Sequence, residues 1–399
     1  MRFLIKRYYI LPVILFALFA GIPAESAPVG IMQLPLMTNP AIVDLSKNDK
    51  IDIRMKEGYK VLEAYLVAQD GAETPVSSIA PESFETNTYS AVIGSPGVAP
   101  GLYGLRIRAR KEFNEEADFQ ARSVWVMSGP PEKLVFAHIS DSHTGDPRST
   151  MSKSVETPDE RRAAVFRAAC DSGAAFMVIT GDLVSVPGNY QREYPKAYDE
   201  IRDNVSIPLF VSPGNHDLYT MSNTSPKPDG VTFWSKYFGP LYYDFSIGRF
   251  TFIALNSYDW PVKFRNFMNS QKMEKYGSYS AGMVDRDQVR WLDGVLSAGE
   301  LRGDTMVCFA HHRVRNFAKS KPGEFAKSQV VETLLRHGVR YYLAGHIHSN
   351  SDTASDGINY STVVSSSSKI NEDAAWGYKL CTLEPGRLSC EFVPVIKQL

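Results

Sequence analysis

The sequence predicts an α/β protein preceded by an all-β domain, and three observations support this prediction. Residues 28–128 alternate apolar and polar positions in short runs, with no convincing helical pattern. After residue 133, apolar strand runs alternate with amphipathic helical stretches, which is typical of layered α/β architecture. Five of these strand runs end in Asp, Asn or His, as expected at the edge of an open α/β sheet where ligands bind.

The first residues have the layout of a secretory signal peptide. Basic Arg2, Lys6 and Arg7 precede an uncharged apolar run and the small-residue exit PAESAP. We predict a signal peptide over residues 1–26, cleaved after Ser26, and therefore a secreted or periplasmic protein. The alternative is an uncleaved membrane anchor, although the apolar run is shorter than the ~20 residues that span a bilayer. No second segment approaches that length, so no transmembrane domain is expected after signal removal.

Composition limits the partners of this chain. The formal net charge of -1 over 399 residues excludes a general nucleic-acid-binding surface, which would need a positive field. Four cysteines are too few for a disulfide framework in a chain of this length. Cys381 and Cys390 flank a hairpin signal, but their spacing leaves open whether they pair, and the oligomeric state is not visible.

The N-terminal part is predicted to be a β-sandwich of immunoglobulin or fibronectin type over residues 28–128. Its strand runs are KIDIRM, VLEAYLVA, YSAVIG, LYGLRIRAR and ARSVWVM. The segment SGPPEKL is a natural linker to a catalytic domain over residues 133–399.

Helix signals appear only in this second part. Thr157, Pro158 and Glu160 form a capping box with proline at the first helical position, which predicts a helix over DERRAAVFRAAC. Further amphipathic helices are predicted over QREYPKAYDEIRDN, DRDQVRWLDGVLS and KSQVVETLLRHGV. The chain then returns to strands at GINYSTVVSS, YKLCTLE and RLSCEFVPV.

The ends of the five apolar strands carry the chemistry. The strands are KLVFAHIS, AAFMVIT, PLFVSPG, TMVCFA and YYLAG, and six of the 8 histidines follow them or lie at their ends. The candidate metal ligands at these ends are Asp141, His143, Asp182, Asn215, His311, His346 and His348. Carboxylate, imidazole and carboxamide without thiolate suit divalent Fe, Mn, Zn or Co. Seven candidates are too many for one tetrahedral ion, so we predict two divalent metal ions that share a bridging carboxylate.

The order of these motifs resembles the calcineurin-like metallophosphoesterase superfamily over residues 133–395. The matching blocks are Asp-x-His, Gly-Asp, Gly-Asn-His-Asp, His-His and Gly-His-x-His. The resemblance implies a four-layer α/β/β/α sandwich. It also implies that one metal binds Asp141, His143 and His348, and that another binds Asn215, His311 and His346. Asp182 would bridge the two ions. His216 would lie beside the scissile phosphate as an acid or transition-state donor.

Two departures from the family pattern change the expectation. Ser185 stands where purple acid phosphatases have a tyrosinate ligand, so no purple enzyme is expected, although an N-terminal β-sandwich is similar to that group's layout. Arg313 follows His312 where many members have proline. This places Arg313 near the metals as a candidate phosphate clamp, with a solvated basic face as the alternative.

Several residues near these motifs have a structural interpretation. His138 is expected to pack in the core, and His337 to end a helix, where an imidazole suits the helix dipole. Asp217 is expected to orient the loop or a histidine. His312 has two open interpretations, as a support for the metal ligands or as a substrate contact.

The predicted function is hydrolysis of a phosphoric ester. Two ions would lower the pKa of a shared water, and the resulting hydroxide would attack a phosphomonoester or phosphodiester in line. The alternative is a catalytically silent metal-bound scaffold that binds partners through its N-terminal sandwich. The aromatic-rich segment from Leu218 to Asp285 is expected to overhang the site, either as a stacking surface for a base or through lid packing.

Overall fold

The computed structural model of the chain describes residues 29–47, 50–82, 85–93, 97–221, 228–267, 281–314, 317, 327–368, 375–397 and 399. The predicted signal peptide, residues 1–26, lies outside the described residues. Within the described part, no helix has both the length and the apolar character needed to cross a membrane.

The N-terminal domain is all-β, which confirms the prediction. A four-stranded sheet in the order β1-β3-β7-β6 faces a five-stranded sheet in the order β2-β9-β8-β4-β5, and Ile53, Leu105 and Val124 belong to the apolar core that they enclose. The strands are β1 (Met32–Leu34), β2 (Ala41–Asp44), β3 (Lys50–Met55), β4 (Lys60–Val67), β5 (Glu73–Pro75), β6 (Ser78–Pro81), β7 (Thr88–Val92), β8 (Gly101–Lys111) and β9 (Asn114–Met127).

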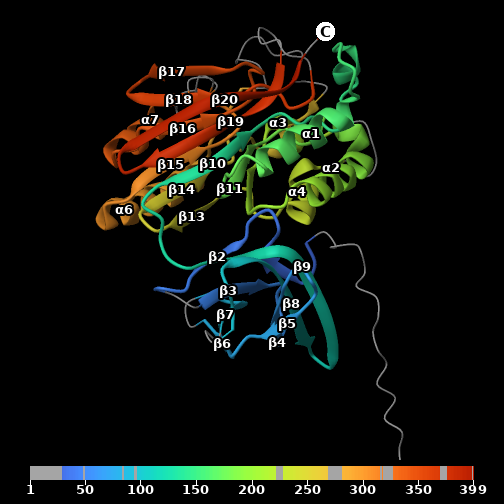
Figure 1. Cartoon of the computed structure of the whole chain (residues 1–399), viewed down its shortest axis with the longest axis vertical. Helices are drawn as coiled ribbons and strands as arrows, with labels where there is room; N and C mark the ends of the chain where they lie inside the picture. The colour runs from blue at the N-terminus through green and yellow to red at the C-terminus, as the bar shows by residue number, and fades with distance from the viewer. Residues whose placement is uncertain are drawn as a thin grey trace, which may run out of the picture.

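The second domain has two sheets packed face to face (Figure 1). The first has the order β12-β11-β10-β19-β20, and the second has the order β13-β14-β15-β16-β18-β17. The strands of the first sheet are β10 (Leu134–Ile139), β11 (Phe176–Thr180), β12 (Leu209–Ser212), β19 (Ala375–Glu384) and β20 (Arg387–Lys397). Those of the second are β13 (Tyr243–Ile247), β14 (Phe250–Ala254), β15 (Thr305–Phe309), β16 (Tyr341–Ala344), β17 (Ser351–Ser355) and β18 (Ile358–Thr362).

Helices cover the outer face of each sheet, which completes the expected α/β/β/α order (Figure 1). Val165 of α1 and Tyr194 of α2 pack in the cluster beneath the first sheet, whereas Leu296 of α6 and Leu334 of α7 pack against the second. The helices are α1 (Pro158–Cys170), α2 (Tyr190–Asn204), α3 (Asn215–Leu218), α4 (Gly230–Tyr237), α6 (Arg286–Arg302) and α7 (Lys327–Arg336). Three 3-10 helices join them: η1 (Pro147–Met151), η2 (Pro187–Asn189) and η3 (Val262–Phe264).

The start of α1 confirms the helix signal read from the sequence. The Thr157 side chain accepts from the backbone N–H of Glu160, and the Glu160 carboxylate accepts from the N–H of Thr157, so the capping box is complete. A cap of this kind satisfies two N–H groups that have no partner within the helix.

The expectation that residues 218–285 overhang the site is wrong for much of that segment. The run YYDF enters β13, whose side chains alternate between buried and exposed, and the next run forms the fully buried β14. Strand pairing explains the aromatic content, because Phe245 and Phe252 fill the space between the two sheets. Residues 222–227 and 268–280 of this segment lie outside the described residues.

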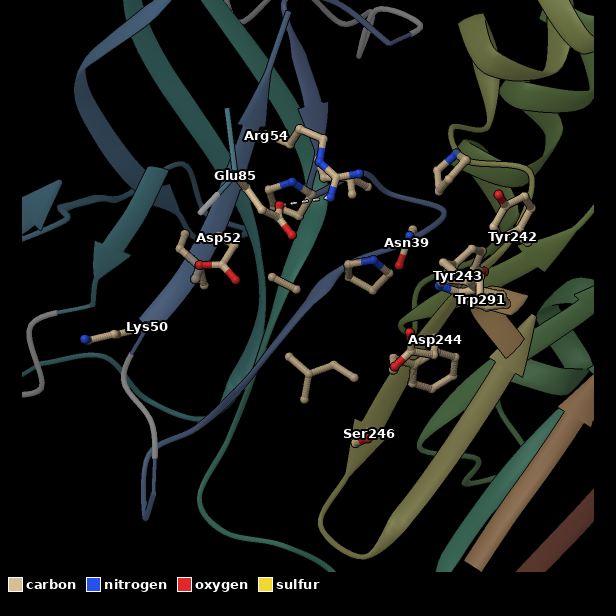
Figure 2. A pocket seen from close by; sticks show the side chains of 18 residues that line it. Asn39, Lys50, Asp52, Arg54, Glu85, Tyr242, Tyr243, Asp244, Ser246 and Trp291 are labelled. Carbon is tan, nitrogen blue, oxygen red and sulfur yellow. Dashed lines mark hydrogen bonds and ion pairs between the residues drawn. The ribbon is translucent and has the colours of Figure 1, made fainter. Parts of the chain in front are cut away.

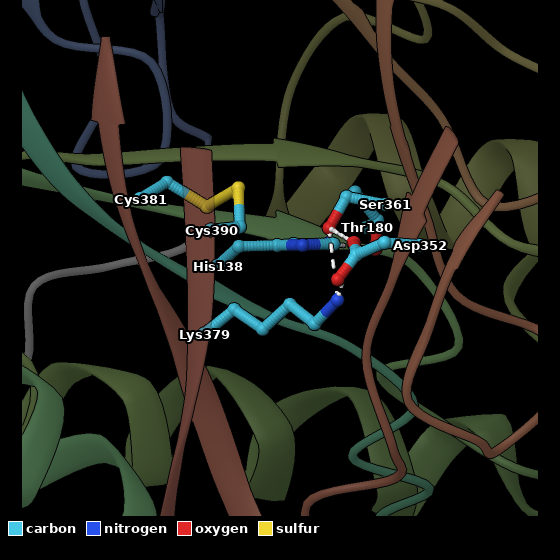
Figure 3. The surroundings of a disulfide bond; sticks show 7 residues. All are labelled: His138, Thr180, Asp352, Ser361, Lys379, Cys381 and Cys390. Atoms are coloured by element: carbon cyan, nitrogen blue, oxygen red, sulfur yellow. Dashed lines mark hydrogen bonds and ion pairs between the residues drawn. A yellow bond between two sulfur atoms is a disulfide. The ribbon is translucent and has the colours of Figure 1, made fainter. Parts of the chain in front are cut away.

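A polar cluster joins the two sheets beside a disulfide bond between Cys381 and Cys390, with a buried Lys379 and an exposed Asp352 (Figure 3). Lys379 of β19 donates to Asp352 Oδ1 at 2.7 Å and to Ser361 Oγ at 3.0 Å, and both partners belong to the second sheet. The cluster therefore ties the sheets by hydrogen bonds as well as by apolar packing.

His138 lies in the same region and has the structural role expected from the sequence. Its side chain is buried, and its Nε2 lies 2.9 Å from Thr180 Oγ1 (Figure 3). Burial and the nearby Lys379 charge lower the pKa of His138 to about 3, so the imidazole is neutral.

The N-terminal and second domains meet along a polar cavity of about 550 Å³ (Figure 2). Asp52 and Arg54 line it from β3, while Asp244 and Trp291 line it from β13 and α6. A direct hydrogen bond joins the two domains on another part of their boundary, where Thr38 Oγ1 donates to the carbonyl oxygen of Phe238 at 2.9 Å.

His337 joins α7 to α6 and provides a test of pH-dependent stability. Its Nδ1 lies 2.7 Å from Glu300 Oε2 and its Nε2 lies 2.8 Å from Asp293 Oδ1. Burial lowers the pKa of His337, but hydrogen bonds to these two carboxylates raise it above its ordinary value. A raised pKa in the folded state means that the imidazolium stabilises the fold at low pH and that this contribution is lost as pH rises through the folded-state pKa.

We predict that His337→Gln lowers the free energy of unfolding by at most about 1 kcal/mol below about pH 6.5, because both carboxylates are half exposed and screened by solvent. The difference from the unmodified chain should shrink as pH rises through the folded-state pKa of His337. Denaturant unfolding at several pH values measures it, and a difference that stays constant with pH would contradict the prediction.

Candidate metal centre

The candidate metal ligands lie where parallel strands of both sheets end. Strands β10, β11 and β12 are parallel neighbours in the first sheet, and β15 and β16 are parallel neighbours in the second. Their carboxyl ends therefore point to the same edge of the sandwich. The loops that follow these strands carry Asp141, His143, Asp182, Asn215, His216, His311, His312, His346 and His348.

The loop backbone is strained at these residues. Nine described residues other than glycine have positive φ, and five of them are candidate ligands. These five are Asp141, His143, Asp182, His346 and His348, with φ between 46° and 70°. A left-handed conformation costs an L-residue roughly 1–2 kcal/mol. Strain of this kind persists only where the surroundings hold it, and it concentrates at functional sites.

The first ligand set is formed by Asp141, His143 and His348. His348 Nε2 lies 3.1 Å from Asp141 Oδ1, and His143 Nε2 lies 3.5 Å from the same oxygen. The two imidazole Nε2 atoms are 3.0 Å apart. These three donor atoms therefore lie close enough together to hold one metal ion.

The second set gathers around His311. Its Nε2 lies 3.0 Å from Asp182 Oδ2 and 3.2 Å from Nδ1 of His346. Asp182 Oδ2 is also 3.7 Å from Nε2 of His143, which belongs to the first set. One carboxylate oxygen of Asp182 therefore lies between the two sets, which is the position of a bridging ligand.

Asn215 belongs to this region through its side-chain amide. Its Nδ2 donates to the hydroxyl of Tyr219 at 2.9 Å, which leaves Oδ1 as the atom that can bind a cation. Oδ1 is buried and has no hydrogen-bond partner among the described residues. The same is true of Asp141 Oδ1. Buried acceptors without a donor are costly, so both oxygens fit a site that takes a cation.

The imidazole tautomers also fit a metal centre. His311 Nδ1 lies 2.8 Å from the carbonyl oxygen of Thr180, and His216 Nδ1 lies 2.5 Å from the carbonyl oxygen of Ser185. A carbonyl can only accept, so in both residues Nδ1 carries the hydrogen and Nε2 has a free lone pair when the ring is neutral. Nε2 of His311, which lies 3.2 Å from Nδ1 of His346, is therefore available to bind a cation.

Electrostatics in the cluster favour ionised carboxylates. Burial works to raise the pKa of Asp141, but the imidazoles of His348 and His311 hold it well below its usual range. Asp182 behaves in the same way, with His311 and His216 as its main neighbours. Burial lowers the pKa of His216 to about 4, against the opposing charge of Asp182.

Asp141 and Asp182 each have one carboxylate oxygen that accepts a backbone hydrogen bond and one that faces the imidazoles. Asp141 Oδ2 accepts from the N–H of His346 at 2.9 Å, and Asp182 Oδ1 accepts from the N–H of His216 at 2.8 Å. These bonds cross between loops that are far apart in the sequence, so the same contacts that position the carboxylates also align the loops.

Asp217 orients the loops, as the sequence predicted. Its carboxylate accepts from the backbone N–H groups of Asp182, Leu183, Val184 and Gly214 at 2.8–3.0 Å. Burial and the charge of Asp182 raise the pKa of Asp217 to about 7, while the N–H groups of Gly214 and Val184 lower it.

The two predicted substrate-binding residues have different positions. His312 lies at the cluster, with its ring 4.3 Å from that of His346 and its Nδ1 at 2.9 Å from Ser257 Oγ. Arg313 has only 6% of its surface exposed. This burial contradicts the alternative of a solvated basic face, and the clamp role of Arg313 stays a prediction.

Sequence reasoning missed the support given by the serine run SSSSK. Ser365 Oγ donates to the carbonyl oxygen of Asp141 at 2.6 Å, and Ser367 Oγ donates to that of Ser142 at 2.5 Å. Ser368 Oγ donates to Asp146 Oδ2 at 3.2 Å. These serines are buried and hold the loop after β10, and no local pattern could have predicted contacts across more than 200 residues.

Sequence reasoning also missed Arg148, which lies in η1 on the same loop. Its guanidinium is bonded to the buried Asp146, with Nε at 2.9 Å and Nη2 at 2.8 Å from Oδ2. The bond to Asp146 raises the pKa of Arg148, and the charge of Asp182 adds a smaller effect in the same direction.

Two sheets, their covering helices and a buried cluster of Asp and His ligands define a metallophosphoesterase. The chain belongs to the calcineurin-like phosphoesterase family, whose model matches residues 134–350. The serine/threonine-protein phosphatase CPPED1 of Bos taurus is 24% identical over 186 residues, which is 44% of this chain and 53% of that protein. The chain thus matches about half the length of this curated relative.

Solved structures show the same fold. A dimetal phosphatase from Danio rerio has a TM-score of 0.50 and 18% identity, and the alignment covers 67% of this chain and 98% of that one. A purple acid phosphatase from yellow lupin (Lupinus luteus) seeds has a TM-score of 0.53 and 13% identity, covering 93% of this chain and 72% of that one. The second alignment extends over the N-terminal β-rich region, whereas Ser185 keeps the sequence distinct at the tyrosinate position.

The bond between Asn215 and Tyr219 gives a test of the site. We predict that Tyr219→Phe weakens the binding of one metal ion by about 10-fold, because the amide oxygen of Asn215 is no longer held by its neighbour. Metal titration against a competing chelator measures this. Tyr243→Phe is the matched control, since its hydroxyl donates to the carbonyl oxygen of Val211 at 2.8 Å in the core. Equal losses in both variants would contradict a specific role for Tyr219.

Proposed function

We propose that the chain is a dinuclear-metal phosphoesterase, with one ion in each ligand set and Asp182 between them. The observation that carries this proposal is the position of Asp182 Oδ2, at 3.0 Å from His311 Nε2 and 3.7 Å from His143 Nε2. Family membership gives independent support. Asp, Asn and His ligands are compatible with Fe, Mn or Zn.

When bound, two divalent ions would lower the pKa of a shared water and neutralise phosphate oxygens. The protein's own residues fix the ligands and hold a proton donor in place. His216 Nδ1 donates to Ser185, so Nε2 is the nitrogen available to the cluster. Donor atoms of His143, Asp182 and His216 lie within 4.8 Å of one another. When the ring is protonated on both nitrogens, Nε2 of His216 can donate a proton to a leaving oxygen or a hydrogen bond to a phosphoryl oxygen.

A catalytically silent scaffold is the competing function. A retired enzyme is expected to lose its bridging carboxylate or the histidine beside the substrate, and this chain retains both Asp182 and His216 within one buried cluster. We therefore favour the enzyme. We also propose export of the chain, on the basis of the basic and apolar pattern of residues 1–26.

The first experiment is hydrolysis of para-nitrophenyl phosphate and bis-para-nitrophenyl phosphate by chelated protein with Mn, Zn or Fe added back. Metal-dependent turnover of either ester is the expected result, because Asp and His groups that could hold metal ions lie together within the family fold. No turnover with any metal, in protein that retains two bound ions, would favour the scaffold.

Asp182 gives the sharpest mutational test. Asp182→Asn removes the charge of the proposed bridging ligand, so we predict at least about 100-fold losses in affinity for the second ion and in kcat, beyond the 10–100-fold typical of supporting residues. Asp244→Asn is the control, because that carboxylate lies on β13 at the cavity between the domains (Figure 2). Metal content and turnover of Asp182→Asn equal to those of the control would refute the bridging role.

A further inference from the structure

The loop after β10 contains a positively charged side chain, Arg148, that has no role in the candidate ligand sets. Arg148 is the second residue of η1, whose N-cap is Asp146. The side chain of Arg148 is 54% exposed, whereas that of Asp146 is 1% exposed. The same loop contributes Asp141 and His143 to the first ligand set. Arg148 therefore reaches from a buried anchor toward solvent at the edge of the cluster.

The buried anchor fixes the direction of the guanidinium. Nε lies 2.9 Å from Asp146 Oδ2 and Nη2 lies 2.8 Å from the same oxygen, while the backbone N–H of Arg148 donates to Oδ1 at 2.8 Å. Asp146 is itself held by Ser368 Oγ at 3.2 Å. One edge of the guanidinium is therefore occupied. In the described part of the chain, Nη1 on the opposite edge has no recorded hydrogen-bond partner.

The loop geometry keeps the anchor of Arg148 close to the candidate ligands. The N–H of Asp146 donates to the carbonyl oxygen of His143 at 3.0 Å, and the N–H of His143 donates to that of Asp182 at 2.9 Å. These bonds fold the start of η1 back onto two ligand residues.

A guanidinium at this position can distinguish phosphomonoesters from phosphodiesters, because the two differ in charge and in the number of terminal oxygens. A phosphomonoester carries a charge of about -1.5 to -2 near pH 7 and has three terminal oxygens. A diester carries one negative charge and has two. If two ions engage two oxygens, only the monoester keeps a third for a charge-assisted hydrogen bond.

We propose that Arg148 is a substrate-binding residue that makes this site selective for phosphomonoesters over phosphodiesters. The inference rests on the proposed phosphoesterase function. It is separate from the clamp role predicted for Arg313, and Asp146 is the residue that anchors the Arg148 side chain.

The test compares Arg148→Ala, Arg148→Lys and the control Arg290→Ala in metal-loaded protein near pH 7.5, where a monoester is a dianion. Arg290 is an exposed arginine paired with Asp287 on α6. We expect Arg148→Ala to lower kcat/KM for para-nitrophenyl phosphate by about 10- to 100-fold, the effect of one charge-assisted hydrogen bond. The diester should lose less than about 3-fold, Arg148→Lys should recover part of the monoester activity, and Arg290→Ala should match the unmodified chain.

A second readout does not depend on turnover. Binding of inorganic phosphate to the metal-loaded protein, measured by calorimetry, should weaken by about 10-fold in Arg148→Ala while metal content stays unchanged. Equal losses for monoester and diester, or unchanged phosphate binding, would overturn the role of Arg148. Absence of turnover in the unmodified protein would instead contradict the proposed function, and phosphate binding would still decide the role of Arg148.

Discussion

Two carboxylates, Asp141 and Asp182, are buried at the point where the two sheets meet, and the rest of the site is arranged around them. Removing a charged carboxylate from water costs several kcal/mol unless partners replace the lost hydration. Each carboxylate receives one backbone N–H on one oxygen and faces imidazole nitrogens with the other. The backbone bonds reach His346 and His216, so the stability of the buried charges depends on the correct alignment of loops from both sheets.

Facing donor atoms also link metal binding to folding. Two pairs of imidazole nitrogens face each other in the cluster. His143 Nε2 lies 3.0 Å from His348 Nε2, and His311 Nε2 lies 3.2 Å from His346 Nδ1, so a cation could be shared within each pair. An ion bound to such a cluster would stabilise the folded chain, because an unfolded chain offers no preformed site. The left-handed backbone at five of the ligands indicates that the loops are held in this geometry by other contacts.

Those other contacts come from residues that never touch the ligand atoms. Asp217 collects four backbone N–H groups from two loops, and the buried serines 365–368 hold the loop after β10. Lys379 ties the two sheets together beside the disulfide. The site is therefore fixed by hydrogen bonds across the sandwich, and the half-exposed Arg148 is anchored on the buried Asp146.

The sequence by itself determined the class of fold, the position of α1 and the five loops that carry the ligands. Local sequence patterns predict these features, namely apolar strand runs followed by candidate ligand residues, a capping box and short motifs with fixed spacing. Tertiary structure decided which oxygen of Asp182 lies between the two sets, that residues 243–254 build a sheet, that Arg313 is buried, and that Arg148 lies at the edge of the cluster. Contacts such as Ser368 with Asp146 join residues 222 positions apart, and no local periodicity encodes them, because they exist only after the two sheets have packed.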